Sequence, residues 1–213
     1  MNLFSRIAIG TANWGREYNG VKVSEKEIGK ILGYAQCNGI DTLDCATAYG
    51  WDWTRANSFF NVVVKIRWHD DREKVEATHP YCIMRHHVED GEFFGPTYEG
   101  RWGISCYQPR DLNVNADPDV IQVPYSLYDR RFDEVIERFK GEIHVRSIFL
   151  RGKIIADGIP PEECVKFCLA NPHIDKIIIG VDSVDQLQRS LNFIHLWNPL
   201  EKHDEQLLDP RKW

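Results

Sequence analysis

Four polar side chains occur at or near the ends of three consecutive short apolar runs. Asp44 and Tyr49 follow the first run, Lys65 lies near the end of the second, and His86 follows the third. Together these residue types can assist the reduction of a carbonyl group. A tyrosine hydroxyl can supply the proton that the developing alkoxide needs, and its ordinary pKa of about 10 is lowered by a nearby ammonium group.

The other two side chains complete the predicted tetrad. A carboxylate at Asp44 would keep Lys65 charged and oriented, and a hydrogen-bond donor at His86 would position the carbonyl oxygen. Each residue alone has an ordinary explanation, as a turn former, a wall aromatic, a strand-end charge or a loop residue. Their joint placement at three consecutive strand ends is what predicts a site for general-acid catalysis.

The elements that must position these residues are short β-branched runs that alternate with helical patterns. A capping box formed by Ser24 and Glu27 begins the first helix, and further helices are expected at 133–139, 160–170 and 183–194. Strands are expected at 6–9, 40–43, 61–66, 81–84, 102–104, 119–123, 144–149 and 176–179. This order predicts an α/β fold, a (β/α)8 TIM barrel, in which catalytic residues gather at the carboxyl ends of the strands. An open doubly wound sheet is the alternative.

The middle of the chain leaves little room for outer helices. Between Tyr49 and the sixth strand, about a dozen to sixteen residues join successive strands, close to the minimum for a parallel crossover. We therefore expect several shortened or missing helices there, with the bared strand faces covered by tryptophans, by loops or by a second subunit in a homo-oligomer. Residues 1–197 are predicted to form a single barrel, and the polar residues 198–213 a C-terminal tail.

Composition excludes several classes of protein. The net charge of -6 is spread along the chain, so no basic face for nucleic acid is expected, and no apolar run is long enough for a membrane span. The chain enters a strand at Ile7, which predicts no signal peptide. Six cysteines without such a signal indicate free thiols in a cytoplasmic, reducing compartment. Cys164 and Cys168 lack a matching pair of ligands, so we expect buried thiols and no metal.

Several segments resemble motifs of the aldo-keto reductase family. Residues 39–50 are similar to the segment that leads into Asp-Thr-Ala-x-x-Tyr-Gly, with Cys45 in place of a threonine. Residues 83–86 match a Leu-Leu-x-His strand, which selects His86 over His87. Further similar segments lie at 10–15, 103–105, 121–125, 145–152 and 179–187, so the resemblance covers roughly residues 6 to 195. It implies a reductase for an aldehyde or ketone, a small molecule that is sugar-related in some relatives.

The resemblance also implies NADPH or NADH as cofactor and no metal. By position, Ser105 and Gln122 would bond the nicotinamide carboxamide, and Arg146 replaces a tyrosine that stacks on the nicotinamide ring. The other positions that the resemblance assigns to the cofactor are Thr11, Ser147, Phe149, Leu150, Gly152, Gly180, Ser183 and Gln186.

Some residues depart from the family pattern. Cys106 replaces an asparagine, and Asp182 stands near the position of a basic residue that grips the 2′-phosphate of NADPH. A carboxylate there would repel that phosphate, which favours NADH or weak dinucleotide binding altogether. One alternative is a catalytically weak or inactive barrel that acts as a binding or regulatory protein. A second is a barrel that binds no dinucleotide and does other chemistry with the same tyrosine, lysine and histidine. Four tryptophans are expected either to form a substrate wall or to cover bared strands: Trp14, Trp51, Trp53 and Trp68.

Overall fold

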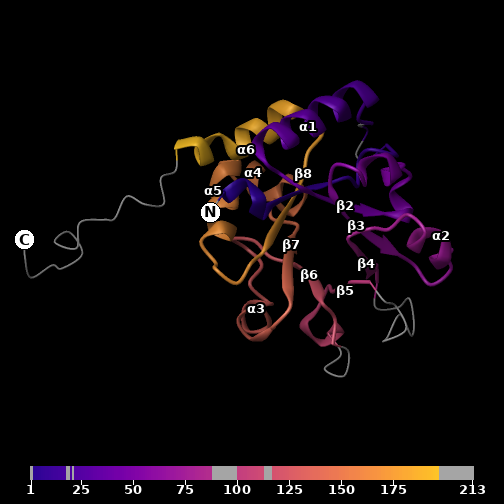
Figure 1. Cartoon of the computed structure of the whole chain (residues 1–213). Helices are drawn as coiled ribbons and strands as arrows, with labels where there is room; N and C mark the ends of the chain where they lie inside the picture. Colours follow the sequence, from indigo (N-terminus) through magenta and orange to yellow (C-terminus); the bar gives the residue numbers. More distant parts are fainter. Residues whose placement is uncertain (1, 18–19, 21, 88–99, 113–116, 197–213) are drawn as a thin grey trace, which may run out of the picture.

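A computed structural model gives the fold of the 213-residue chain and describes residues 2–17, 20, 22–87, 100–112 and 117–196. Eight parallel strands close into a barrel in chain order, and β1 pairs with β8 to complete it (Figure 1). The strands are β1 Ile7–Gly10, β2 Thr42–Ala46, β3 Asn61–Ile66, β4 Cys82–Arg85, β5 Trp102–Ser105, β6 Val120–Pro124, β7 Glu142–Arg146 and β8 Lys176–Gly180. The predicted (β/α)8 barrel is confirmed, and the open-sheet alternative is wrong.

The outer helical layer is thick on one side of the barrel only. Figure 1 shows α1, α5 and α6 together on that side, and α6 packs against both of the others. The helices are α1 Glu25–Asn38, α2 Arg72–Glu76, α3 Asp133–Arg138, α4 Lys153–Ala156, α5 Pro161–Leu169 and α6 Val184–Leu196. Five 3-10 turns complete the described elements: η1 Leu3–Arg6, η2 Thr47–Tyr49, η3 Trp53–Ala56, η5 Pro109–Asp111 and η6 Leu150–Gly152.

Helix α1 shows why the sequence signals were readable. The Ser24 side chain accepts a hydrogen bond from the Glu27 amide at the first turn. At the other end Gly39 ends the helix in the left-handed region, with a φ of 78°. Ile28, Ile31 and Ala35 form the buried face of the helix, so the capping residues and the apolar stripe agree with each other.

The outer helical layer is reduced in the middle of the chain, where the short crossovers predicted it to be. Between β3 and β4 the only described helix, α2, is five residues long. The described part of the connection from β5 to β6 contains only the turn η5. Residues 88–99, which fall between β4 and β5, and the predicted tail at 198–213 lie outside the described residues. Three indoles pack on the core here, from Trp51, Trp53 and Trp102. This packing favours tryptophans as the cover, whereas the second subunit stays a prediction.

The buried side chains of β3 belong to two separate apolar clusters. Val62, Val64 and Ile66 face outward and join the large cluster under the helices. Val63 faces the barrel axis, where it packs with Cys82, Met84 and Val120. Because successive side chains alternate between faces, Lys65 lies on the same inner face as Val63. The strand therefore carries a lysine into an apolar interior.

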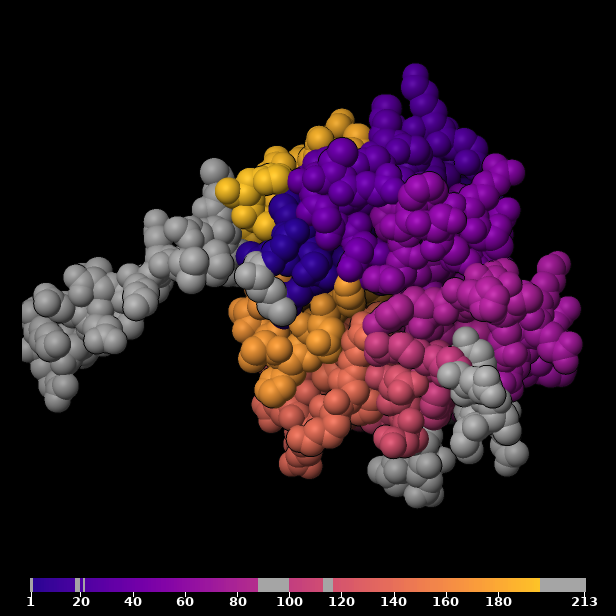
Figure 2. Space-filling model, in the orientation of Figure 1, coloured from indigo at the N-terminus to yellow at the C-terminus, as the bar shows by residue number. Residues whose placement is uncertain are grey.

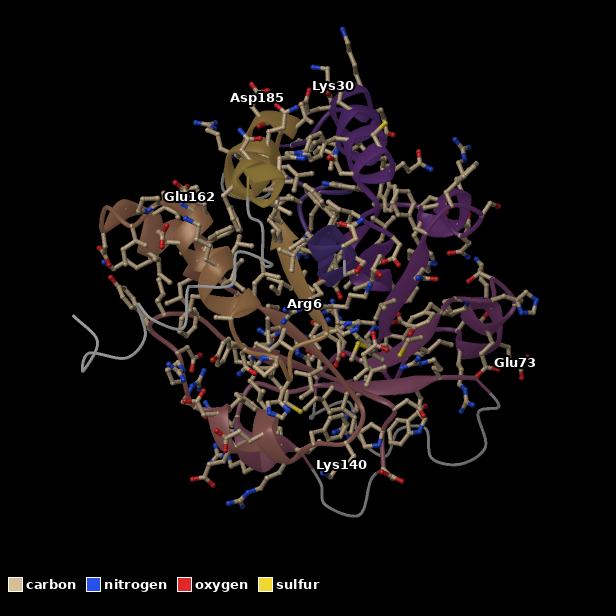
Figure 3. The ribbon with its side chains drawn as sticks, turned by 60° about the vertical axis from the view of Figure 1, so that its left-hand side comes forward. Arg6, Lys30, Glu73, Lys140, Glu162 and Asp185 are labelled. Atoms are coloured by element: carbon tan, nitrogen blue, oxygen red, sulfur yellow. The ribbon has the colours of Figure 1, made fainter. Side chains whose placement is uncertain are left out.

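Arg6 ties the first strand to the last crossover. Its guanidinium donates hydrogen bonds to the carbonyls of Leu169, Asn171 and Ile174 at 2.8 Å each. Figure 3 labels Arg6 near the centre of the view, while Lys30, Glu162 and Asp185 lie on the outer surfaces of α1, α5 and α6. At the surface, Figure 2 shows indigo residues of the N-terminus beside yellow residues of α6.

Candidate active site

A buried ion pair occupies the carboxyl end of the barrel interior. Lys65 Nζ lies 2.5 Å from both carboxylate oxygens of Asp44, and the lysine side chain is 2% exposed. Burial would lower the pKa of Lys65, but its interactions with Asp44 and Tyr49 raise it above its ordinary value. The ammonium therefore stays charged inside the barrel.

Tyr49 lies directly beside this pair. It ends the turn η2 that follows β2, and its ring centroid is 5.3 Å from Lys65 Nζ. The structure thus brings Asp44, Tyr49 and Lys65 together, as their positions at strand ends predicted. The pKa of Tyr49 is raised, because burial of the phenol outweighs the lowering effect of Lys65. Lys65 thus lowers the pKa of Tyr49 as expected, but the net shift in this state is upward.

His86 follows β4 and completes the group of four. Its ring meets the ring of Tyr49 edge to face, with 5.8 Å between centroids. Burial, helped by the charges of Lys65 and His87, lowers the pKa of His86 to about 3, so the imidazole is neutral. Its Nδ1 is buried and has no hydrogen-bond partner within the described residues. His87 stacks on its other side, with 4.3 Å between ring centroids.

Gln122 belongs to the same network, a role that the sequence did not reveal. Its Oε1 accepts a hydrogen bond from Lys65 Nζ at 3.3 Å, and its Nε2 donates one to Asp44 Oδ1 at 2.8 Å. The side chain is 0% exposed. The resemblance assigns this amide to the nicotinamide carboxamide, but here it is already engaged. A fully buried glutamine on an apolar strand needs internal partners, and that requirement is the signal that could have found this role.

Backbone contacts fix the segment that carries the tetrad. Thr11, expected to contact the cofactor, is fully buried and donates from both its amide and its hydroxyl to the Asp44 carbonyl, at 3.0 and 3.1 Å. Its observed role is to hold the end of β2. Gly15 approaches the same segment closely, since a Cβ atom on it would lie 2.3 Å from the Tyr49 carbonyl oxygen. Only a glycine can stand there without displacing Tyr49.

Asp70 is a second residue that the sequence analysis missed. One of its carboxylate oxygens accepts hydrogen bonds from Thr47 Oγ1 at 2.5 Å and from the Arg67 amide at 2.7 Å. It thereby connects the loop after β2 with the loop after β3. An aspartate close behind a strand end is the usual side chain for capping such a turn, so its position was a readable signal.

The predicted nicotinamide contacts lie across the barrel mouth. Ser105 is buried and pairs in register with Gln122 on the next strand. Arg146, expected to stack on the nicotinamide, instead lies over Tyr107, with 4.2 Å from Cζ to the ring centroid. Its guanidinium also donates to the Cys106 carbonyl at 2.9 Å. The cation is thus held by a neighbouring aromatic ring in this state.

The loop after β7 has an unusual backbone. Ser147, Leu150 and Arg151 have φ values of 61°, 46° and 55°, and Gly152 has 86°. Left-handed backbone at three residues with side chains costs free energy, and such residues cluster at binding sites. This loop contains four predicted cofactor contacts: Ser147, Phe149, Leu150 and Gly152.

The predicted adenosine end lies between β8 and α6. A Cβ atom on Gly180 would meet nothing within 4 Å, so the strand ends against open space. Ser183 Oγ accepts from the Gln186 amide, and Gln186 Oε1 accepts from the Asp182 amide. The Asp182 carboxylate accepts a hydrogen bond from Asn13 Nδ2 at 2.7 Å.

The four tryptophans predicted to contact substrate differ in how exposed their side chains are. Trp14 is 1% exposed and meets Trp51 edge to face, with 4.8 Å between ring centroids. Trp53 is half-buried against the core. Trp68 is 72% exposed and follows β3. Trp14 is therefore a core residue and not an accessible wall, whereas Trp68 is placed where a ligand could reach it.

A second polar cluster lies at the opposite end of the barrel. The Glu142 carboxylate accepts hydrogen bonds from Tyr81 and Arg101 at 2.9 and 2.5 Å and pairs with His144 at 2.7 Å. A cavity of about 1020 Å³ opens beside it at the amino ends of β5 to β8. In such barrels this end serves stability and the other end carries the chemistry, so we assign the cluster a structural role.

Solved structures with a similar fold were found. A provisionally named aldo-keto reductase from Pseudomonas aeruginosa is 20% identical, with 88% of this chain and 87% of that chain covered and a TM-score of 0.67. A provisionally named 2,5-diketo-D-gluconic acid reductase B is 13% identical, with 89% and 82% covered and a TM-score of 0.61. A Gox0644 variant in complex with NADPH is 14% identical, with 88% and 82% covered and a TM-score of 0.64. Neither a family model nor a curated protein matches the sequence.

These similarities concern the fold. The chain has the barrel fold of the aldo-keto reductases, as the resemblance of its motifs implied. Within the described residues, each helix is too short or too polar to cross a membrane. The roles of the individual site residues stay predictions.

Proposed function

We propose that this protein reduces an aldehyde or ketone with NAD(P)H. The observation that carries the proposal is the buried Asp44–Lys65 ion pair, placed beside Tyr49 and the neutral His86 at the carboxyl end of the barrel. Burying a charged pair costs free energy that a purely structural core would avoid. A barrel that keeps such a pair next to a phenol and an imidazole has the groups that proton transfer to a carbonyl requires.

Each side chain has a distinct task in the proposed reaction. Bound NAD(P)H supplies the hydride that reaches the carbonyl carbon. Tyr49 donates its proton to the carbonyl oxygen, and the Lys65 ammonium stabilises the phenolate that remains. Asp44 keeps that ammonium charged and in place. His86, neutral at physiological pH, donates a hydrogen bond that orients the carbonyl oxygen.

The residues present fit a dinucleotide along the barrel mouth. The left-handed backbone at Ser147, Leu150 and Arg151 marks a strained loop on one side of the mouth, and the end of β8 at Gly180 borders open space. Ser105 and Gln122 would face the nicotinamide from β5 and β6. Because the Gln122 amide bonds Asp44 and Lys65, a carboxamide contact there requires this amide to exchange partners.

Negative charge at the adenosine end favours NADH over NADPH. The Glu27 carboxylate accepts a hydrogen bond from the Val184 amide at 2.9 Å, at the start of α6. The Asp182 carboxylate lies in the turn before that helix. Both would repel a 2′-phosphate, whereas a free ribose diol can donate to a carboxylate. Lys30 pairs with Glu27 and reduces this repulsion in part.

Two measurements on the purified chain test the proposal. Fluorescence titration should give a tighter dissociation constant for NADH than for NADPH. Oxidation of the bound cofactor, followed at 340 nm over a panel of aldehydes and ketones, should then show turnover. Tight binding without oxidation of any carbonyl would favour the binding or regulatory alternative, and no fluorescence change with either nucleotide would reject the reductase.

A further inference from the structure

Among the described residues, three arginines near the proposed carbonyl site have no carboxylate partner. Arg16, Arg67 and Arg146 form no ion pair within the part of the chain that the structure describes. The carboxylates nearby are engaged elsewhere: Asp44 binds Lys65, and Asp70 binds Thr47 and a backbone amide. Among the described residues, these parts of the mouth therefore carry positive charge that has no carboxylate partner, although the chain as a whole has a net charge of -6.

Two of these arginines lie on the tyrosine and histidine side of the mouth. Arg16 Cζ is 5.7 Å from the ring centroid of Tyr49. Arg67 directly follows β3, two residues beyond Lys65, and its Nε is buried without a hydrogen-bond partner among the described residues. After burial, the charges of Lys65, His87 and Arg67 contribute to the lowered pKa of His86. The guanidinium of Arg67 is thus electrostatically coupled to the imidazole that would hold the carbonyl oxygen.

A half-buried guanidinium such as that of Arg67, which has no ion-pair partner in the described part of the chain, is suited to bind an anion. Its planar donors match a carboxylate or phosphate in a two-point hydrogen bond. A cleft lined by one sign of charge also concentrates ligands of the opposite sign. The orphaned Nε of Arg67 shows that no group of the described protein already fills this role.

We propose that the substrate is an aldehyde or ketone that also carries an anionic group, a carboxylate or a phosphate, which Arg67 binds with help from Arg16. This inference rests on the proposed reductase function and adds the substrate class to it. Arg146 is left out of the anion site because it lies over Tyr107 on the side assigned to the nicotinamide.

The alternative use of these cations is to bind the pyrophosphate of the cofactor. The predicted pyrophosphate loop, residues 147–152, follows β7, whereas Arg67 follows β3. In the closed barrel these two strands are separated by β4, β5 and β6. Arg67 is therefore placed to meet the substrate and not the pyrophosphate, and kinetics can separate the two.

The test compares 3-carboxybenzaldehyde with its neutral isostere 3-formylbenzamide. We expect kcat/KM at least tenfold higher for the carboxylate, and a preference that falls as salt is added. The Arg67→Gln variant should lose most of this preference, whereas Arg67→Lys, which keeps the charge, should retain part of it. The KM for NADH should stay unchanged in both. Arg138→Ala, an exposed arginine on α3, is the control.

The outcomes distinguish this inference from the proposed function. Equal kcat/KM for the two aldehydes, or an Arg67→Gln variant that raises the KM for NADH instead, overturns the anion site and leaves the reductase intact. If neither aldehyde is reduced, titration of tryptophan fluorescence with benzoate and benzamide still decides. Selective binding of benzoate that Arg67→Gln weakens supports the site, and equal binding of the two probes overturns it.

Discussion

Lys65 Nζ lies 2.5 Å from both oxygens of the Asp44 carboxylate, and both side chains are enclosed by the barrel. The pair is thus shielded from solvent except through the mouth. A buried charge that loses its partner is strongly destabilising, because its desolvation is no longer offset. This relationship between two residues links the stability of the chain to its proposed chemistry.

The Asp44→Asn variant should be much less stable than the natural chain. It leaves the Lys65 ammonium buried without a counter-charge, at a cost of about 3–5 kcal/mol in the free energy of unfolding. Urea denaturation at pH 7 measures the change, and Asp185→Asn on the exposed surface of α6 is the matched control. An unchanged midpoint for Asp44→Asn would show that the pair does not contribute to folding.

Gly15→Ala should abolish turnover by moving Tyr49. The added methyl group would stand 2.1 Å from the Gly50 carbonyl carbon and 2.3 Å from the Tyr49 oxygen, so the backbone must shift. Gly29→Ala is the control, because a methyl group there meets nothing and should stabilise α1 by about 1 kcal/mol. Full activity in Gly15→Ala would mean that the position of Tyr49 is not critical.

The pH profile of carbonyl reduction should be flat from about pH 5 to 8. With its pKa lowered to about 3, His86 stays neutral across this range, so no change of rate appears near the ordinary histidine pKa of about 6.5. Because the pKa of Tyr49 is raised, the rate should fall only above about pH 10, where the phenol loses its proton. Steady-state kcat/KM against pH measures both limits, and a midpoint near 6.5 would contradict the assignment of His86.

Glu142 should make the free energy of unfolding depend on pH in the acidic range. Burial would raise the pKa of Glu142, but hydrogen bonds from His144 and Tyr81 and the charge of Arg101 lower it from 4.5 to about 2. A depressed carboxyl pKa stabilises the fold above the unfolded value, and this contribution of about 3 kcal/mol is lost as the pH falls from 4.5 to 2.

The Glu142→Gln variant isolates this contribution. Its free energy of unfolding should be lower than that of the natural chain at pH 6, and the gap should shrink as the pH approaches 2. Denaturation midpoints at a series of pH values measure it. A gap that stays constant with pH would mean that Glu142 does not titrate between the two values.

Strand positions were readable where burial and β-branching coincide. The expected strand at 61–66 has those bounds in the structure, because Val62 to Ile66 are all buried. The seventh strand was expected at 144–149 but lies at Glu142–Arg146. Ile148 misled the prediction, since it is buried in the loop, while the left-handed backbone of Ser147 ends the strand before it.

The sequence predicted the four residues of the candidate site but not the hydrogen bonds that Gln122 makes to two of them. Asp44, Tyr49, Lys65 and His86 come together because carboxyl ends of neighbouring parallel strands share one edge, which the sequence pattern specifies. The hydrogen bonds of Gln122 to that pair depend on side-chain reach across the barrel, from β6 to β2 and β3. The apolar strand around Gln122 indicates that the amide needs internal partners, but no local pattern specifies which residues across the barrel supply them.

Removal of the Tyr49 hydroxyl group tests most directly whether Tyr49 is the proton donor. In Tyr49→Phe the ring is kept and the proton donor is removed, so NADH should bind with nearly unchanged affinity while carbonyl reduction slows by a factor of about 100 or more. Fluorescence titration and single-turnover oxidation of NADH measure the two quantities on the same sample. A variant that binds NADH and retains the full rate would contradict the assignment of Tyr49 as the acid.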